Sequence, residues 1–302
     1  MRAAGFALLA IFPPLLAADA HRVEPPSREA SSAALHPADA RRDEPSERVL
    51  RVCADPAGLP FSSEARDGFE NEVASLLARD LGARLEYTWW VQRRGFFRNT
   101  LNASRCDVVI GVPKGLDLAR TTKPWYRSTY TFVSRADSGL ADLRSIDDPR
   151  LRRLRIGVPL AGDDGANPPP VHVLARRGIV DQVRGFHLYA EIGRSVPAAI
   201  EAVERSEIDV AMLWGPVAGA GAKRANVPLV VTPVAEERDG EQPLTFAIAM
   251  ATRRSDETLA RELDAFIERR RDALGAILAR AGVPTVPATP RAPGDGGPDR
   301  AR

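Results

Sequence analysis

The chain has 302 residues, and its 42 Lys and Arg are nearly balanced by 40 Asp and Glu, which gives a formal net charge of +2 at pH 7. Basic and acidic residues are interspersed along the sequence, so the charge pattern does not indicate a nucleic-acid-binding protein. The length fits two small domains or one large one.

The N-terminal segment is typical of an export signal. Arg2 precedes an apolar stretch over residues 3–17, and Ala18-Asp19-Ala20 matches the small-residue pattern of a cleavage site. A membrane anchor is the alternative interpretation, but the stretch is short and Pro13-Pro14 interrupts it. We therefore expect residues 1–20 to be a signal peptide, and the mature chain to be extracytoplasmic with no membrane-inserted segment.

The composition changes at both ends of the mature chain. Residues 21–48 are rich in Pro, Glu, Arg, Ala and Ser without an apolar period, and residues 285–302 are rich in Pro and Gly. Such segments cannot bury enough apolar surface to fold, so we expect a disordered leader and a disordered tail.

Strands and helices alternate in the first part of the remaining region, as in a parallel sheet with right-handed crossovers. The first helix has apolar residues at helical spacing, from Phe69 through Val73 and Leu77 to Leu81. The third strand is apolar almost throughout, which is typical of a sheet buried on both faces. In chain order we expect a strand at 49–55, a helix at 69–81, a strand at 85–90, a short helix at 96–103, a strand at 107–112 and an extended stretch at 126–134.

A second alternating series follows. In chain order it comprises a strand at 155–160, a helix at 169–178, a strand at 184–189, a helix at 195–205, strands at 208–214 and 229–234, an extended stretch at 244–252 and one long helix from 255 to about 282. One extended segment enters this series and another leaves it, so the pattern predicts two α/β lobes joined by a two-strand hinge with a central cleft. Lobe one is expected over residues 49–133 plus 245–284, and lobe two over residues 134–244.

Candidate binding residues gather where the strands end, because ligands of open parallel sheets bind beyond the carboxyl ends of the strands. The first strand ends in Ala54-Asp55-Pro56 and the third in Gly111-Val112-Pro113, and all four Trp residues fall at or just beyond strand ends. Aromatic side chains there could form an apolar pocket, although ordinary packing between the lobes is an equally good interpretation. The candidate cleft residues are Asp55, Phe61, Phe69, Glu70, Trp90, Arg94, Gly111, Pro113, Tyr126 and Trp214.

These candidates would have different roles. Asp55 and Arg94 would supply charge, the aromatic residues would form walls, and Gly111 would allow a ligand close to the backbone. For Arg94, an exposed arginine at a helix start is the alternative interpretation. The sequence carries no catalytic signature and its histidines have no metal-ligand spacing, so we expect neither an enzyme nor a metal site.

The two cysteines, Cys53 and Cys106, leave two alternatives open. An even number of cysteines in an exported protein favours a disulfide. If residues 49–55 and 107–112 form neighbouring parallel strands, however, Cys53 lies late in one strand and Cys106 just before the other. An offset of several residues, at about 3.3 Å each, would exceed the Cα separation that a disulfide allows.

Several motifs resemble one branch of a known superfamily. They are RVCADP, LPFS, GFENE, YTWWVQRRGFFRNTLN, CDVVIGVP and TTKPWYRSTY. Together they resemble the J-type accessory proteins (MxaJ/XoxJ), a branch of the type II periplasmic solute-binding proteins. The resemblance spans about residues 49–284; it is specific in the first third and rests mainly on pattern in lobe two.

The resemblance implies a type II periplasmic binding-protein fold and a soluble periplasmic protein without enzymatic activity. As partner it implies a periplasmic PQQ-dependent (quinoprotein) methanol or alcohol dehydrogenase, with the cytochrome c of that enzyme, which the protein would help to mature, activate or assemble. No cofactor is expected to be bound permanently, and PQQ would be involved only through the partner.

The cleft itself suggests the alternative function, a solute-binding receptor of an ABC transporter for a small molecule. Amino-acid-binding relatives of this superfamily have a longer T-x-x-R turn after the third strand, whose Arg binds the ligand carboxylate. Here the link from Gly111 to Trp125 is short, and Arg120 does not match that position. An ordinary amino acid is therefore not the expected ligand.

Overall fold

The structure is a computed structural model that describes residues 47–160, 167–187 and 195–287. The predicted signal peptide, most of the predicted leader and tail, and the end of the strand predicted at 184–189 lie outside the described residues. Within the described residues, no helix is long and apolar enough to cross a membrane.

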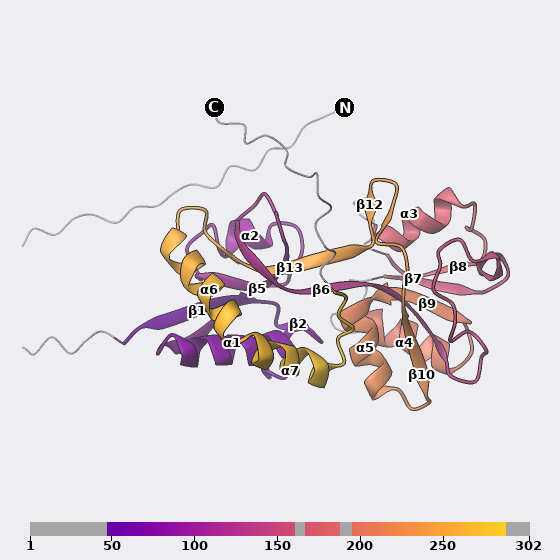
Figure 1. The fold of residues 1–302 in the computed structure, drawn as a ribbon, viewed down its shortest axis with the longest axis horizontal. Coiled ribbons are helices and arrows are strands. Elements are labelled where there is room, and N and C mark those ends of the chain that lie inside the picture. The colour runs from indigo at the N-terminus through magenta and orange to yellow at the C-terminus, as the bar shows by residue number, and fades with distance from the viewer. Residues whose placement is uncertain (1–46, 161–166, 188–194, 288–302) are drawn as a thin grey trace, which may run out of the picture. The chain divides into compact units, whose positions relative to one another are not determined.

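Nine strands form one continuous sheet (Figure 1). They are β1 (Val49–Ala54), β4 (Arg84–Trp89), β5 (Val108–Pro113), β6 (Arg120–Arg135), β7 (Ile156–Leu160), β8 (Val183–His187), β9 (Val210–Trp214), β10 (Leu229–Pro233) and β13 (Thr245–Thr252). The order is β4-β1-β5-β13-β6-β9-β7-β8, and β10 also pairs with β6. Two small ribbons lie beside this sheet, β2 (Ala57–Gly58) with β3 (Ser62–Ser63), and β11 (Arg238–Asp239) with β12 (Gln242–Pro243).

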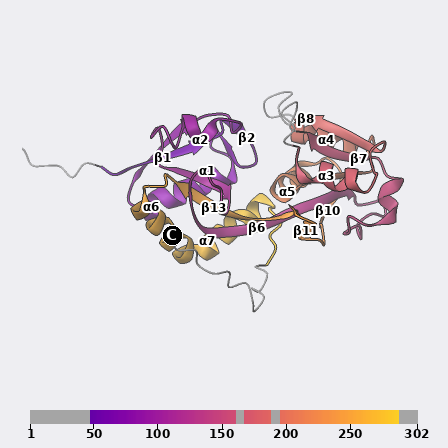
Figure 2. The same ribbon diagram turned by 90° about the horizontal axis from the view of Figure 1, so that it is seen from above.

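The sheet has a parallel part at each end and antiparallel strands between them. β1 is parallel to β4 and β5, and β7 is parallel to β8 and β9. β13 and β6 run antiparallel to each other, and β6 continues into antiparallel pairing with β9 and β10. Figure 2 shows β6 passing from one parallel part to the other. These two strands are the predicted two-strand hinge.

Helices cover both faces of the two parallel parts. The helices are α1 (Phe69–Asp80), α2 (Phe96–Asn99), α3 (Pro169–Arg176), α4 (Ser195–Glu204), α5 (Gly215–Arg224), α6 (Glu257–Arg269), α7 (Arg271–Ala281) and the 3-10 helix η1 (Pro149–Arg152). In lobe one, α1, α6 and α7 pack on one face of the strands and α2 on the other, with a separate buried cluster on each face (Figure 1). In lobe two, α3 and α4 likewise contribute to separate clusters. The fold thus consists of two α/β lobes joined by two antiparallel strands, as the sequence predicted.

The sequence did not predict α5. Its segment begins with Gly215-Pro216 and contains two further glycines, a composition that indicates a turn. Proline is well accommodated in the first helical turn, however, because the N–H that it lacks has no partner there. Gly219 allows close packing, since a Cβ at this position would lie 1.8 Å from the carbonyl oxygen of Gly282. The glycines therefore serve helix packing.

The single long helix predicted from 255 to 282 is wrong, because the structure has two helices that meet at Arg270. The segment from Glu268 to Asp272 consists of charged residues without a buried apolar side chain, so nothing holds a continuous helix face against the sheet there. Arg269 and Arg270 both donate to the buried carboxylate of Asp80 at the end of α1. This contact orients the junction.

Cys53 and Cys106 form a disulfide, with a Cα–Cα distance of 5.5 Å. The argument against the bridge from strand register was therefore wrong. Val52 does pair with Val108, but Cys106 precedes β5 and packs with Phe96 on the face of the sheet toward which Cys53 points. Because Cys106 and Asp107 precede β5, the residue offset between the cysteines does not translate into distance along the strand.

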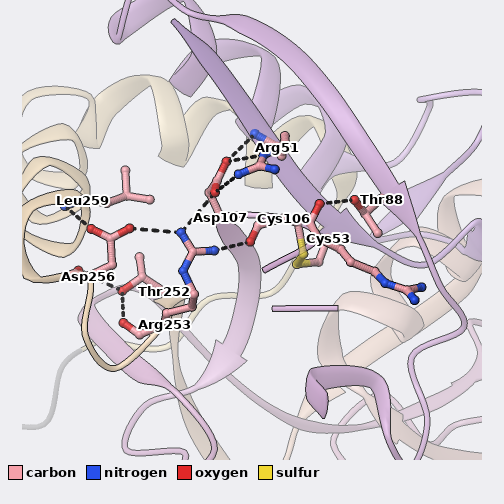
Figure 3. Close-up of polar contacts among 10 residues, drawn as sticks. Arg51, Cys53, Thr88, Cys106, Asp107, Thr252, Arg253, Asp256 and Leu259 are labelled. Atoms are coloured by element: carbon pink, nitrogen blue, oxygen red, sulfur yellow. Dashed lines mark hydrogen bonds and ion pairs between the residues drawn. A yellow bond between two sulfur atoms is a disulfide. The ribbon is translucent and has the colours of Figure 1, made fainter. Parts of the chain in front are cut away.

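A polar cluster lies beside the disulfide (Figure 3). The Asp107 carboxylate accepts hydrogen bonds from the backbone and guanidinium of Arg51 and from Arg253. Burial alone would raise the pKa of Asp107, but these hydrogen bonds outweigh it and hold the pKa below its usual range. Arg253 also donates to the carbonyl of Cys106, so the cluster fixes the start of β5 against β1 and the end of β13.

Candidate functional site

A cavity of about 380 Å³ lies between the lobes, at the carboxyl ends of β5 and β9. This is where ligands bind in open α/β sheets, and the volume is within the range of small-molecule pockets. The described residues that line it are Phe61, Glu70, Gln92, Gly111, Val112, Pro113, Tyr126, Tyr130, Pro159, Pro168, Leu213, Trp214, Val217, Phe246 and Ile248.

Aromatic side chains from both lobes and the hinge form the walls of the cavity. The Trp214 ring lies edge-on to Tyr130 and to Phe246, with centroid distances of 5.5 and 5.6 Å. Tyr126 is held the same way by Trp125, at 4.5 Å. Trp214 packs against the main buried clusters of both lobes, so this wall is shared between them. Burial raises the pKa of Tyr130, so its hydroxyl stays protonated at neutral pH.

The loop before α1 positions the lobe-one side of the cavity. The backbone carbonyls of Pro60 and Phe61 accept the N–H groups of Phe69 and Glu70, at 3.0 and 2.8 Å. The buried Asn71 side chain accepts from the backbone of Ser63 and of Gly68. These bonds satisfy N–H groups that the start of a helix leaves without partners, and they fix Glu70 at the cavity wall.

Glu70 is the one charged residue among the described residues that line the cavity. In the part of the chain that the structure describes, its carboxylate has no hydrogen-bond or ion-pair partner. Burial raises the pKa of Glu70 to about 8. Burial, and then the charge of Glu70, raise the pKa of Tyr126 well above its usual value.

Gly111 makes room for this carboxylate. A Cβ on Gly111 would lie 2.0 Å from Oε1 of Glu70, far inside van der Waals contact. The sequence predicted Gly111 as a place where a ligand approaches the backbone. In the structure, the group that approaches it is the Glu70 side chain.

The structure places six of the ten predicted cleft residues on the cavity wall: Phe61, Glu70, Gly111, Pro113, Tyr126 and Trp214. A seventh, Phe69, is buried behind the wall, with its ring 5.4 Å from Phe61 and 6.4 Å from Tyr126. It supports the wall without forming part of the lining.

The remaining three candidates lie elsewhere. The Asp55 carboxylate accepts from the backbone N–H groups of Ala57 and Gln92, at 2.9 and 2.6 Å, and so holds two loops together. Trp90 is 38% exposed, with the Arg105 guanidinium 5.8 Å from its ring centroid. Arg94 is exposed on the following turn, as in the alternative interpretation for this residue.

Several wall residues were missed by the sequence reasoning, including Tyr130, Phe246 and Ile248. All three lie in β6 and β13. Their place in the predicted hinge strands was a usable signal, since a hinge between two lobes borders the cleft between them. Arg120 lies outside the cavity lining and pairs with Glu257, as expected of a residue that does not bind a ligand carboxylate.

No model of a protein family matches the sequence. Protein MoxJ of Methylorubrum extorquens is 30% identical over 258 residues, which cover 80% of this chain and 83% of MoxJ. The crystal structure of the periplasmic binding protein XoxJ from Methylobacterium extorquens AM1 has 35% sequence identity and a TM-score of 0.66, and covers 80% of this chain and 100% of XoxJ.

A second crystal structure, of MxaJ from Methylophaga aminisulfidivorans MPT, has 27% identity and a TM-score of 0.70 over 79% of this chain and 100% of MxaJ. These similarities extend over nearly all of the described residues and include both lobes. The chain therefore belongs to the J-type family of MoxJ, MxaJ and XoxJ within the periplasmic binding proteins.

Proposed function

We propose that this protein is a non-enzymatic periplasmic accessory protein of a PQQ-dependent methanol or alcohol dehydrogenase. It would help that enzyme to mature, become active or assemble, and PQQ would belong to the partner. The observation that carries the proposal is membership of the J-type family, with 30% identity to MoxJ over 80% of the chain. Export to the periplasm fits the N-terminal sequence and the disulfide between Cys53 and Cys106.

The cavity supports the same proposal. Amino acids bound as nutrients carry a carboxylate, and an Arg side chain binds a carboxylate strongly through paired hydrogen bonds. No Lys or Arg is present among the described residues that line this cavity. The binding-protein scaffold thus departs from amino-acid reception, as expected of a scaffold that serves another function.

Gene deletion tests the accessory function. In a strain without the gene, methanol-dependent dye reduction in periplasmic extracts should fall several-fold, and the purified dehydrogenase should contain less PQQ per subunit. Expression of the wild-type chain from a plasmid should restore both values, and the same plasmid with an early stop codon should not. Unchanged activity together with unchanged PQQ content would refute the proposal.

The cavity of about 380 Å³ favours one other function, reception of a small solute for an ABC transporter. Affinity purification of the mature protein from periplasmic extract, followed by mass spectrometry of retained proteins and small molecules, separates the two. A retained quinoprotein dehydrogenase or its cytochrome c supports the accessory function. A stoichiometric solute without a protein partner supports the receptor function.

A further inference from the structure

The environment of the Glu70 carboxyl group is unusual for a cavity that binds no ligand. It lies at the wall of an apolar cavity, and no hydrogen-bond donor or cation within the described residues contacts its oxygens. A carboxylate without partners is costly to remove from water. The Gly111 backbone lies so close that any larger residue there would displace the group. The local structure thus keeps the Glu70 carboxyl group facing the cavity without a hydrogen-bond or ion-pair partner among the described residues.

The other side chains that line the cavity restrict which ligand could pair with Glu70. The lining contains no Lys or Arg among the described residues, so an anion would find no counter-charge. Tyr126, Trp214 and Phe246 present aromatic rings, and such rings attract cations as well as apolar groups. A ligand that matches all of these features has one positive charge for Glu70 and an apolar body for the rings.

We propose that the cavity binds a small organic monocation, an ammonium group on an apolar body without a carboxylate, whose charge pairs with Glu70 and whose body packs against Tyr126, Trp214 and Phe246. This inference does not depend on the proposed accessory function, because it concerns the chemistry of the cavity and not the partner protein.

Pairing with a cation would couple binding to proton release. The pKa of Glu70 is about 8, so without ligand the carboxyl group is mostly protonated at pH 7. The ionisable groups that respond to its charge are Tyr87 on β4 and Tyr126 on β6, and the pKa of each is raised, so both stay neutral in this range. Binding should therefore release close to one proton per ligand at pH 7. Affinity should rise by close to tenfold per pH unit below about pH 7 and more gradually as the pH approaches 8.

Three matched probes test the charge preference by isothermal titration calorimetry with the full mature chain. They are 2-phenylethylammonium, which stays cationic below about pH 10, the neutral 2-phenylethanol and the anionic phenylacetate. At pH 8 the ammonium probe should bind at least tenfold tighter than the alcohol, and phenylacetate should not bind. The apparent binding enthalpies at pH 7 in phosphate and in Tris should differ by the number of protons released times the difference between the ionisation enthalpies of the two buffers.

Three single substitutions, two in α1 and one in β5, test whether Glu70 causes the preference for the ammonium probe. Glu70→Gln keeps the shape and removes the charge, so the ammonium probe should lose its tenfold preference and its proton release. Glu72→Gln changes an exposed carboxylate on the same helix that pairs with Arg280 and lies outside this cavity, so it should behave as wild type. Gly111→Ala should weaken the ammonium probe without removing a charge, because its Cβ would displace the Glu70 carboxylate.

Each contrary result overturns the proposal. These are absence of ammonium binding at millimolar concentration, equal binding of ammonium and alcohol, and a preference for the ammonium probe that persists in the Glu70→Gln variant. Circular dichroism of each variant excludes misfolding as the cause. Because the probes are tested on the purified protein, none of these outcomes bears on whether gene deletion lowers dehydrogenase activity.

Discussion

The ionisation of Glu70 should make the protein less stable as pH rises. Its pKa is raised from 4.5 to about 8 in the folded protein, so the folded state keeps a proton that the unfolded chain releases near pH 4.5. The stability that this proton contributes is fully present below pH 4.5 and is lost as pH rises toward 8. The free energy of unfolding should fall by at most about 1.4 kcal/mol per pH unit. Urea unfolding of wild type and Glu70→Gln between pH 5 and 8.5 measures it, and the variant should gain stability relative to wild type as pH rises.

The same Glu72→Gln variant is the control for this measurement, because it removes an exposed carboxylate, which pairs with Arg280, from the same helix. Its stability difference from wild type should stay nearly constant over the pH range. A constant difference for Glu70→Gln as well would mean that the Glu70 carboxyl is ionised normally in the folded protein.

The disulfide should stabilise the folded protein substantially. Cys53 and Cys106 are separated by 53 residues, and closing a loop of this length lowers the entropy of the unfolded chain by an amount worth about 4 kcal/mol. The double variant Cys53→Ala/Cys106→Ala should therefore lose about 2–4 kcal/mol of unfolding free energy in urea. Thiol titration of the denatured wild type without reductant should detect no free thiol, and two free thiols would contradict the bridge.

At the residue scale, the sequence predicts which residues line the site better than it predicts which of their side chains are available to a ligand. Phe61, Tyr126 and Trp214 were identifiable because aromatic residues near strand ends border a cleft. The Asp55 carboxylate accepts from two backbone N–H groups, whereas Glu70 has no partner among the described residues. This difference follows from loop geometry that no sequence pattern encodes. The structure was therefore needed to show which of these two acidic residues is available to a ligand.

At the scale of elements, two glycines in helices should respond in opposite ways to the same substitution. A Cβ on Gly219 in α5 would lie 1.8 Å from the Gly282 carbonyl oxygen, whereas a Cβ on Gly275 in α7 would meet nothing within 4 Å. Alanine is the better helix former by up to about 1 kcal/mol. Gly275→Ala should therefore stabilise the protein by up to that amount.

Gly219→Ala should instead destabilise it by about 1–3 kcal/mol, because α5 must move away from the end of α7. Thermal and urea unfolding of both variants give the two changes on one scale. Stabilisation by Gly219→Ala would mean that α5 does not pack against the α7 terminus as closely as the structure has it.

The contrast between these glycines also explains which elements the sequence could predict. Elements with a clear apolar pattern, such as the periodic α1 and the almost continuously apolar β5, begin and end within one residue of the predicted bounds. α5 was missed because glycines that allow two backbones to approach look the same in sequence as glycines that form a turn. The α6–α7 junction was missed because Asp80, the residue that fixes it, comes nearly 200 residues earlier in the chain.

At the scale of the whole molecule, the two lobes should unfold together. β6 pairs with β13 in its first half and with β9 and β10 in its second, so neither lobe can lose this strand alone. Trp214 adds side-chain contacts to the main clusters of both lobes. The wild type should therefore show one urea transition, with the same midpoint whether it is followed by circular dichroism or by hydrogen exchange in peptides of either lobe.

Trp214→Ala should weaken this coupling, because it removes the ring that packs between Tyr130 and Phe246 at the junction. Loss of a buried large aromatic residue costs about 3–5 kcal/mol. Trp214 is only partly buried, so the expected loss is near the lower end of this range. Hydrogen exchange should then show different midpoints for the two lobes. Trp90→Ala, which removes a 38% exposed ring outside the junction, should change stability by less than about 1 kcal/mol and leave a single midpoint. If both variants keep one shared midpoint, the backbone pairing of β6 is sufficient to couple the lobes, and the role assigned here to Trp214 is wrong.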